Sequence, residues 1–380
     1  MGALTTASAN NDSRAAEIAV KLDRVLSWLS DTGYEAALFA SQPGVAWATA
    51  GLEDRISRNE EPGQVWVLVD EAGGHLLTTN VEEPRLISEL EVEALGFQLH
   101  VAPWYRPGGL GDLVAELGGK RRIATDGYGP GEAVADELAF LRMPLTPHEH
   151  ERLDALGRDC ANALEGVLRT WTPPEKETQV AARIAAALEE RMILPSVLLV
   201  GGYERRRRFR HFVPTEAATG GDVLAVIVGV RGGLNIACSR TASVAISPED
   251  LAHHRAACAV EAAMIAATAP GTSWESVLKV GQRAYGEAGY PDEWKLHWQG
   301  GPIAYNSREY DVVPGTRTGA AAIILGSAFA WNPTVQGGKS EDTFILTDSG
   351  ARPVSNTTDW PELTIETPAG ALARPAILAL

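Results

Sequence analysis

The sequence predicts an α/β protein with two domains. The chain has 380 residues, more than one ordinary hydrophobic core organises. Apolar segments with the period of a strand alternate with segments that have the period of a helix along most of its length. Hydrophobic residues make up 45% of the chain and charged residues 22%, a balance that favours a globular protein over a disordered one.

The first domain is predicted over residues 15–145, and the small, polar residues 1–14 before it are expected to be a disordered tail. Apolar residues recur at helical spacing over 15–30, and Asp31-Thr32-Gly33 is expected to end that helix. Ser41-Gln42-Pro43-Gly44 is expected to be a turn. Strands are predicted over 36–40, 65–69, 75–79 and 122–125, and further helices over 84–94 and 109–117.

The second domain is predicted over residues 146–380. Thr146-Pro147 is typical of a helix start, with proline in the first turn, and that helix is expected to reach about Thr170. Residues 349–380 are expected to be a polar tail without catalytic residues. Further helices are predicted over 178–192, 248–267 and 274–288, and strands over 196–200, 222–230, 234–244, 323–331 and 341–347.

Charge and composition exclude several classes of partner. The net charge of −16 argues against nucleic acid and anionic membranes, and the one basic run, Arg205–Arg208, is expected to be a solvated loop or one side of a subunit contact. No apolar run reaches the roughly 18 residues of a membrane span. The N-terminal segment lacks an apolar secretory core, and three cysteines do not suggest a disulfide framework. We expect a soluble, cytoplasmic protein.

The stretch from Leu296 to Glu341 carries the chemistry. His297 precedes Gln299-Gly300-Gly301, Arg308-Glu309 follows, and Asn332 lies in Trp331-Asn332-Pro333. These segments, with Gly221-Asp222 and Ser239-Arg240-Thr241 upstream, resemble the creatinase/prolidase/methionine-aminopeptidase (peptidase M24) superfamily. The resemblance implies a creatinase-type N-terminal α/β domain followed by a C-terminal pita-bread domain.

Metallopeptidases of this superfamily hold two divalent ions with two Asp, one His and two Glu. In this chain His297 and Glu341 match two ligand positions, whereas Ile227, Ala237 and Asn332 stand at the other three. Isoleucine and alanine offer no lone pairs, and a neutral amide poorly replaces a carboxylate. The resemblance therefore predicts no metal site and no cofactor.

Creatinase is the precedent for a metal-free site, and the departures run in its direction. The resemblance makes His211 a general acid/base, because imidazole moves protons near neutral pH. Its alternative is a structural histidine at a strand end. His297 and Glu341 complete the expected catalytic set; without a metal, His297 donates to an oxyanion or only hydrogen-bonds within the former metal cavity.

Substrate binding is assigned to Arg308, Asn332, Ser239 and Arg240. Arg308 suits bidentate contact with a carboxylate, with an ion pair to Glu309 or another acid as the alternative. Ser239 stands where creatinase has a Glu, which puts creatine itself in doubt.

The charged loop at residues 53–61 resembles a loop that caps the partner's active site in creatinase-like dimers. The resemblance makes Arg55 and Arg58 further substrate-binding candidates, and it implies a homodimer. The alternative is a solvated loop.

The favoured function is a metal-independent hydrolase, or a lyase, that acts on a C–N bond of a small amidino or amide compound bearing a carboxylate. One alternative is a non-catalytic pita-bread module that binds a peptide or protein partner. A second alternative is a metal-dependent Xaa-Pro aminopeptidase. A closed polar pocket favours the enzyme, and a pocket plugged by apolar side chains favours the module.

Overall fold

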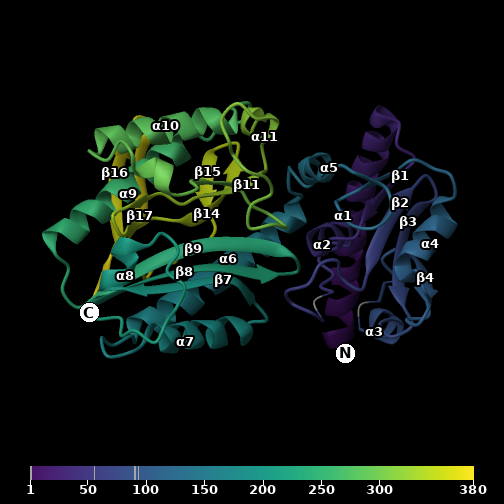
Figure 1. Cartoon of the computed structure of the whole chain (residues 1–380), viewed down its shortest axis with the longest axis horizontal. Coiled ribbons are helices and arrows are strands. Elements are labelled where there is room, and N and C mark those ends of the chain that lie inside the picture. The colour runs from purple at the N-terminus through teal and green to yellow at the C-terminus, as the bar shows by residue number, and fades with distance from the viewer. Residues whose placement is uncertain (1, 55, 90, 93) are drawn as a thin grey trace. The chain divides into compact units, whose positions relative to one another are not determined.

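The computed structural model describes residues 2–54, 56–89, 91–92 and 94–380. The chain divides into two compact units, Met1–His148 and Glu149–Leu380, and each is described by itself. The predicted boundary, between residues 145 and 146, lies three residues before this division. Figure 1 shows a mixed α/β arrangement in both units.

A mixed sheet forms the centre of the first unit, in the order β4-β3-β2-β1-β5-β6. Its middle strands are apolar and fully buried, and they pack on α4 through Leu110, Leu113 and Val114. The strands are β1 (Ala36–Phe39), β2 (Trp66–Asp70), β3 (Gly73–Thr79), β4 (Gln98–Ala102), β5 (Ile123–Thr125) and β6 (Glu132–Ala133). The helices are α1 (Gly2–Thr32), α2 (Gln42–Ala48), α3 (Glu83–Ser88), α4 (Gly109–Gly118) and α5 (Ala135–Leu141).

Two segments of this unit differ from expectation. Helix α1 includes residues 2–14, which the sequence predicts as a tail. The predicted turn at 41–44 instead begins helix α2, because the Ser41 hydroxyl accepts a hydrogen bond from the Gly44 amide and proline occupies the first turn. A capping serine followed by proline is equally typical of a turn and of a helix start.

The second unit contains a sheet of order β18-β9-β8-β7. A long apolar run forms β8, and Gly232 and Gly233, both with positive φ, make the tight turn into β9. Helix α7 packs beside β7 (Figure 1). The bounds are α6 (Pro147–Arg169), α7 (Glu177–Glu189), β7 (Leu194–Gly202), α8 (Tyr203–Arg208), β8 (Asp222–Arg231), β9 (Leu234–Ser243) and β18 (Leu378–Ala379).

A second sheet, β10-β11-β14-β15, lies beside β9 through β14. Trp274, Tyr285 and Trp331 are fully buried between its strands and the helices α9 and α10. Both helices start at a serine whose hydroxyl caps the first turn. The bounds are α9 (Pro248–Ala267), α10 (Trp274–Glu287), η1 (Glu293–Leu296), β10 (Gly300–Pro302), α11 (Arg317–Ala320), β11 (Ala328–Trp331), β12 (Thr334–Val335), β13 (Gly338–Lys339), β14 (Asp342–Thr347), β15 (Gly350–Pro353), β16 (Glu362–Thr367) and β17 (Gly370–Pro375).

The prediction of a polar tail over 349–380 is wrong. These residues form β15 to β18, and Arg374 of β17 is buried, with its guanidinium 2.7 Å from Glu261 of α9 and 2.8 Å from Asp342 of β14. A buried ion pair formed with distant residues leaves no periodic pattern in the local sequence.

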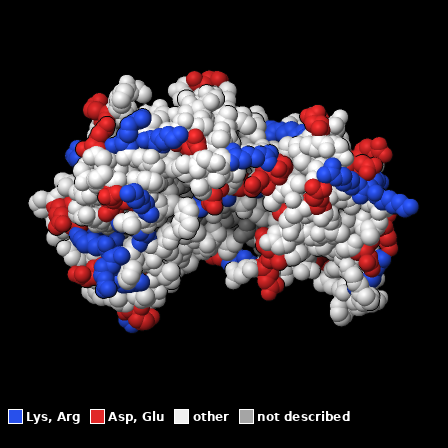
Figure 2. All heavy atoms as spheres, turned by 45° about the horizontal axis from the view of Figure 1, so that its top comes forward, with Lys and Arg blue, Asp and Glu red and all other residues white. Residues whose placement is uncertain are grey.

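No helix among the described residues is long and apolar enough to cross a membrane. On the face shown in Figure 2, basic and acidic side chains are interspersed and do not gather into one large basic patch.

Candidate functional site

The second unit places five polar residues at the ends of short elements. His211 lies between α8 and β8, and His297 follows η1. Asn332 follows β11, Lys339 ends β13, and Glu341 directly precedes β14. All five belong to segments that leave or enter the second sheet or the β7–β8–β9 sheet, so the two sheets position them.

His211 and His297 form a contacting pair of imidazoles. Their ring centroids are 5.3 Å apart in an edge-to-face arrangement. Burial, together with the smaller effects of the nearby Lys339, His211 and Arg210 charges, lowers the pKa of His297 to about 2. Burial also lowers the pKa of the more exposed His211, and the charges of Lys339 and Arg308 act in the same direction. Both rings are therefore neutral near pH 7.

Lys339 and Glu341 form a buried ion pair. The Nζ of Lys339 lies 3.5 Å from Oε2 of Glu341, and the two side chains are 4% and 5% exposed. The same ammonium donates to the carbonyl oxygen of Asn332 at 3.2 Å. Burial raises the pKa of the Glu341 carboxyl, and the Lys339 charge and a hydrogen bond from Asn332 oppose that rise. Lysine and glutamate two residues apart thus meet inside the fold.

Several buried polar atoms around this pair have no hydrogen-bond partner within the described part of the chain. They are Ser239 Oγ, His297 Nδ1, Asn332 Oδ1, Thr334 Oγ1 and Glu341 Oε2. Buried polar groups are nearly always satisfied, so a cluster of exceptions indicates a place for a polar ligand or water. The predicted residues Ser239, His297, Asn332 and Glu341 all belong to this cluster.

The pairing of β8 with β9 corrects one assumption of the sequence analysis. Ala237 and Ser239 pair with Val228 and Val226, and residues paired in this way point to the same face. Ile227 lies between these two valines, so its side chain points to the opposite face of the sheet. The ligand position assigned to Ile227 therefore falls on a valine instead, which lacks lone pairs as well.

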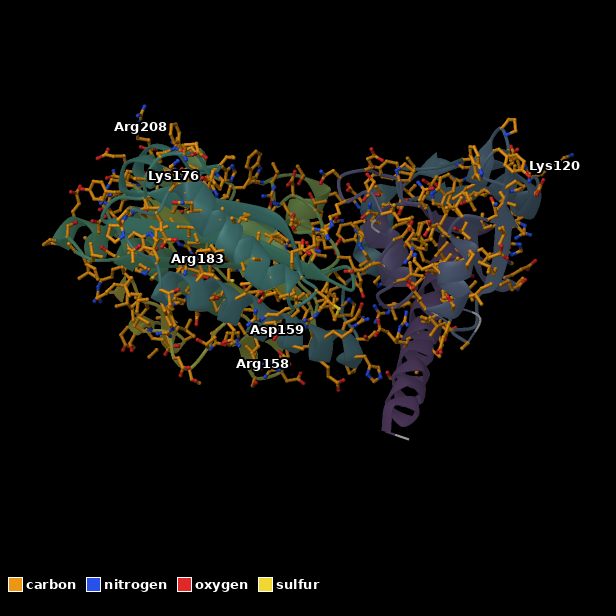
Figure 3. The ribbon with its side chains drawn as sticks, turned by 90° about the horizontal axis from the view of Figure 1, so that it is seen from below. Lys120, Arg158, Asp159, Lys176, Arg183 and Arg208 are labelled. Carbon is orange, nitrogen blue, oxygen red and sulfur yellow. The ribbon has the colours of Figure 1, made fainter. Side chains whose placement is uncertain are left out.

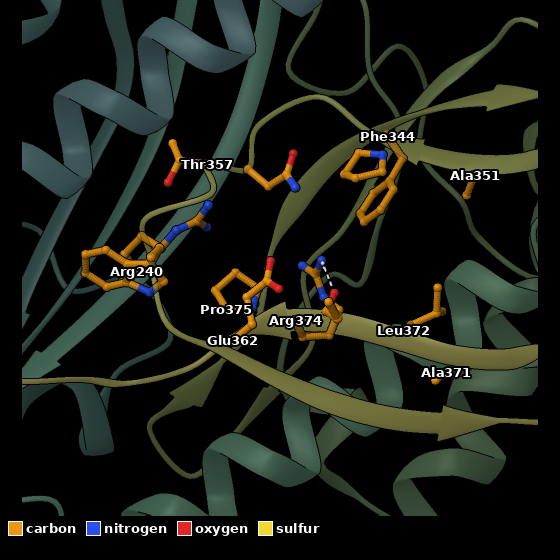
Figure 4. Close-up of a pocket in the computed structure, with 13 residues that line it drawn as sticks. Arg240, Phe344, Ala351, Thr357, Glu362, Ala371, Leu372, Arg374 and Pro375 are labelled. Atoms are coloured by element: carbon orange, nitrogen blue, oxygen red, sulfur yellow. Dashed lines mark hydrogen bonds between the residues drawn. The ribbon is translucent and has the colours of Figure 1, made fainter.

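Arg240 faces away from the site, which contradicts its predicted role in substrate binding. Its guanidinium lies 2.8 Å from Glu165 of α6 and 3.0 Å from Asp342, and it donates to the carbonyl oxygens of Ser239 and Ser355. Figure 4 shows Arg240 and Arg374 beside a separate cavity of about 200 Å³. Because carboxylates already engage both guanidinium groups, the two arginines have a structural role.

Arg308 lines a cavity of about 130 Å³ together with His297. Its guanidinium lies 5.4 Å from the ring centroid of Trp298 and pairs with Asp311, at 2.8 Å, instead of with Glu309. Asp311 is exposed, so this pair is screened and readily exchanged for another anion. The cavity therefore presents a cation and an imidazole within a mostly apolar and aromatic wall.

The arginine run is not a loop, because residues 205–208 belong to helix α8, and its alternative role as one side of a subunit contact stays a prediction. Arg206 is buried, 2.8 Å from Asp222, and it donates to the carbonyl oxygen of Gly337 at 2.8 Å. Arg210 pairs with Glu293 of η1. Arg208, by contrast, projects from the ribbon in Figure 3. Arg206 and Arg210 thus connect the segment that carries His211 to the β12–β13 hairpin and to the η1 helix.

The remaining candidates belong to the first unit. Arg58 lies in the segment between α2 and β2, and it has interactions within the described residues. Arg55 lies outside the described residues. Their predicted role in capping a partner's site stays a prediction.

Sequence reasoning missed Lys339, Gln299 and Tyr285. The Tyr285 hydroxyl lies 2.9 Å from Oε1 of Gln299, and Gln299 donates to the carbonyl oxygen of His297 at 2.7 Å. Lys339 stands two residues before Glu341, the spacing that puts side chains on one face of an extended segment. That spacing was a usable signal, whereas nothing local indicated Tyr285.

The donor set does not fit two divalent ions. The side chains of Val226, Val228 and Ala237 have no lone pairs with which to bind a metal, and the Asn332 side chain is uncharged. The remaining carboxylate, Glu341, already pairs with an ammonium. Among the described residues no group of three or more His, Cys, Asp or Glu side chains is arranged to hold a metal ion. A divalent cation needs several anionic oxygens to offset its lost hydration, and these residues do not supply them.

Comparison with known proteins supports the fold. No protein-family model matches the chain, and no curated protein matches it either. Among solved structures, a dipeptidase PepE from Mycobacterium ulcerans is 20% identical, with a TM-score of 0.74 over 90% of this chain and 96% of that one. An Xaa-Pro dipeptidase from Bacillus anthracis is 16% identical, with a TM-score of 0.72 over 96% and 100%.

The N-terminal domain of the FACT complex subunit SPT16 from chickpea is also similar, at 12% identity and a TM-score of 0.68 over 90% of this chain and 96% of that one. At these identities the likeness concerns the fold. The chain has the two-domain α/β fold, with a pita-bread domain, of these peptidase structures.

Proposed function

We propose that the protein is a metal-independent hydrolase that cleaves a C–N bond in a small amide or amidine bearing a carboxylate. The observation that carries this proposal is the cluster of buried, unsatisfied polar atoms next to the His211–His297 pair. Such a cluster costs stability unless a ligand satisfies it, so it indicates a binding site for a polar molecule.

The chemistry of the unsatisfied atoms selects the ligand. Oε2 of Glu341 and Oδ1 of Asn332 are hydrogen-bond acceptors, so they suit a group that offers several N–H donors. An amide or amidine nitrogen has such donors. The nearby cations suit the opposite end of the substrate: Arg308 exchanges its exposed partner Asp311 for a substrate carboxylate. The cavity of about 130 Å³ is lined by Arg308 and His297 but not by Glu341 or Asn332, so it is assigned to the carboxylate end of the substrate.

His211 is the proposed general acid/base. It is exposed, so water reaches it, and its lowered pKa keeps the ring neutral and able to accept a proton near pH 7. In the proposed reaction neutral His211 takes a proton from water as the oxygen attacks the carbon. The protonated ring then gives that proton to the leaving nitrogen as the C–N bond breaks. A neutral His297 donates a hydrogen bond to the oxygen or nitrogen that gains negative charge.

The test is a panel of guanidino acids, acyl amino acids and Xaa-Pro dipeptides, assayed for binding by thermal shift and for hydrolysis in the presence of a chelator. His211→Ala is expected to keep binding and to lose at least about 100-fold in turnover. Glu341→Gln is expected to weaken binding itself. His100→Ala, a histidine of the first unit, is the control and retains both. Unchanged turnover in His211→Ala on a true substrate would refute the assignment.

A non-catalytic module that binds a peptide or protein is the second candidate. Four large apolar side chains near the two histidines are exposed by 42–64%: Phe209, Val213, Leu296 and Trp298. Exposed apolar side chains grouped around one site are typical of an interaction surface. Moreover, one of the similar structures is the N-terminal domain of a subunit of the FACT complex. If Trp298→Ala abolished binding of a peptide that the wild-type protein never cleaves, the module would replace the enzyme.

Two further parts of the proposal have direct tests. A homodimer, in which the loop with Arg58 approaches the partner's site, predicts twice the chain mass in light scattering. A metal-dependent Xaa-Pro aminopeptidase would instead show about two ions per chain by elemental analysis of protein purified with added manganese or cobalt.

A further inference from the structure

Lys339 is the cation at the centre of the candidate site. Its side chain is 4% exposed, and its Nζ lies 3.5 Å from Oε2 of Glu341. A lysine is rarely buried to this extent unless it is paired. The ammonium also acts at a distance, because its charge is felt by both His211 and His297. One lysine thus neutralises the buried carboxylate and sets the electrostatic environment of both imidazoles.

The fold holds this ammonium in place on both sides. Lys339 ends β13, where it pairs with Thr334 of β12. The preceding Gly338 packs against the backbone of α9 so closely that a Cβ there would lie 2.6 Å from the His253 carbonyl carbon. Arg206 holds the turn of the same hairpin through the Gly337 carbonyl. The hairpin is therefore clamped, and the Lys339 stem has little freedom to swing out to solvent.

The other acid next to Lys339 in the sequence does not compete for it. Asp342 points to the opposite side, where Arg240 and Arg374 lie 3.0 Å and 2.8 Å from its carboxylate oxygens. Glu341 is consequently the carboxylate that the Lys339 ammonium neutralises.

The charges of this pair balance each other, unlike those of a divalent ion with one carboxylate. The metallopeptidases that the sequence resembles set two divalent cations against four carboxylates. Here three of those carboxylates are replaced by uncharged side chains, and Glu341 is left. One monovalent cation balances one carboxylate, whereas a divalent ion would leave an excess positive charge in a buried site.

We propose that the Lys339 ammonium is the chain's built-in replacement for the metal ion: it neutralises Glu341 and fixes the Asn332 segment through the Asn332 carbonyl oxygen. The lysine is a positioning residue, since it acts through Glu341 and Asn332. This inference does not depend on which substrate, if any, the protein cleaves.

The test is a four-member thermal-unfolding cycle of wild type, Lys339→Ala, Glu341→Gln and the double variant. Lys339→Ala leaves a buried carboxylate unpaired and is expected to lower the Tm by at least about 5 °C. Glu341→Gln lowers the Tm of wild type as well, because it leaves the ammonium unpaired. In the Lys339→Ala background the same substitution raises the Tm, because it removes the unpaired charge. Lys279→Ala, which breaks the exposed pair with Glu275, is the matched control and shifts the Tm by less than about 2 °C.

A second readout uses Co²⁺ as the probe. One carboxylate does not balance a divalent ion in a buried site, so Co²⁺ is expected to leave the Tm of Lys339→Ala unchanged. It is not expected to raise that of wild type or of the double variant. If Lys339→Ala does not fold, recovery of folding in the double variant supports the proposal.

Three outcomes overturn it. One is a Lys339→Ala variant as stable as Lys279→Ala. Another is a double variant less stable than Lys339→Ala. The third is a Co²⁺ shift in wild type that Glu341→Gln abolishes, which would show that a metal and not the lysine serves Glu341.

Discussion

Tyr285 offers a sharp test of how the fold holds the site, because one hydroxyl connects two of its segments. The hydroxyl oxygen accepts the Thr334 amide at 3.0 Å, and the hydroxyl proton is shared between Oε1 of Gln299 at 2.9 Å and the Thr334 carbonyl oxygen at 3.3 Å. Gln299 in turn holds the His297 carbonyl. Tyr285→Phe keeps the ring and removes only these bonds.

The expected cost follows from what remains buried. Tyr285 is fully buried, and Gln299 and Thr334 are 6% and 4% exposed, so no solvent replaces the lost hydroxyl. One amide N–H and one amide oxygen are left unsatisfied, at about 1–3 kcal/mol each, so we expect a loss of about 2–6 kcal/mol. The His297 segment also loses its support, so ligand affinity falls with stability.

Urea unfolding measures the cost, and Tyr310→Phe is the matched variant. Tyr310 is buried as well, and its hydroxyl accepts a hydrogen bond from Nε1 of Trp274 at 3.0 Å. Removal of that acceptor leaves the Trp274 donor unsatisfied, so Tyr310→Phe is expected to cost about 1–3 kcal/mol. A Tyr285→Phe variant no less stable than Tyr310→Phe, with unchanged ligand affinity, would refute the proposed support of His297.

Two further predictions concern stability in the second unit. In helix α6, Gly166→Ala is expected to stabilise the protein by about 0.5–1 kcal/mol, because the added Cβ would contact no other atom. Gly157→Ala is expected to destabilise it by about 1–3 kcal/mol, because the added Cβ would lie 2.7 Å from the Val354 carbonyl carbon. Chemical unfolding of the two variants measures both free energies, and equal shifts would contradict the packing. Burial lowers the pKa of His254 from 6.5 to about 4, so the unfolded chain takes up a proton before the folded one, and between pH 6.5 and 4 about 3 kcal/mol of stability is lost. His254→Gln, whose amide can still donate to the Pro375 carbonyl, is expected to flatten that part of the pH–stability profile; an unchanged profile would exclude His254 as its cause.

Local pattern was sufficient for the elements that fill the core. The helix predicted over 248–267 is α9 with the same bounds, because a serine cap followed by proline marks its start and apolar residues continue along it. The strands predicted over 222–230 and 234–244 also match β8 and β9 closely. By contrast, β4 was not predicted, although its residues 98–101 alternate between polar and apolar.

Only part of the candidate site could be predicted from the sequence. His211, His297, Asn332 and Glu341 lie together, because the motif order reflects how the strands bring these segments to one place. Arg240 was assigned to substrate binding, yet it faces α6. A residue's side of a strand depends on the parity of its pairing, and an error of one position reverses it.

The sequence by itself determined that this is a two-domain α/β chain, and its resemblance to the M24 metallopeptidases predicted uncharged side chains at three of the five metal-ligand positions. Those conclusions rest on residue identity and local period, which need no coordinates. Only the tertiary structure decided which charges meet. Lys339 and Glu341, two residues apart, pair beside a hairpin held by Arg206 and α9, while the adjacent Asp342 pairs with arginines that come from β9 and from the supposed tail. Electrostatic partners depend on distance and burial in space, so position in the chain alone does not decide which of two neighbouring acids pairs with the lysine.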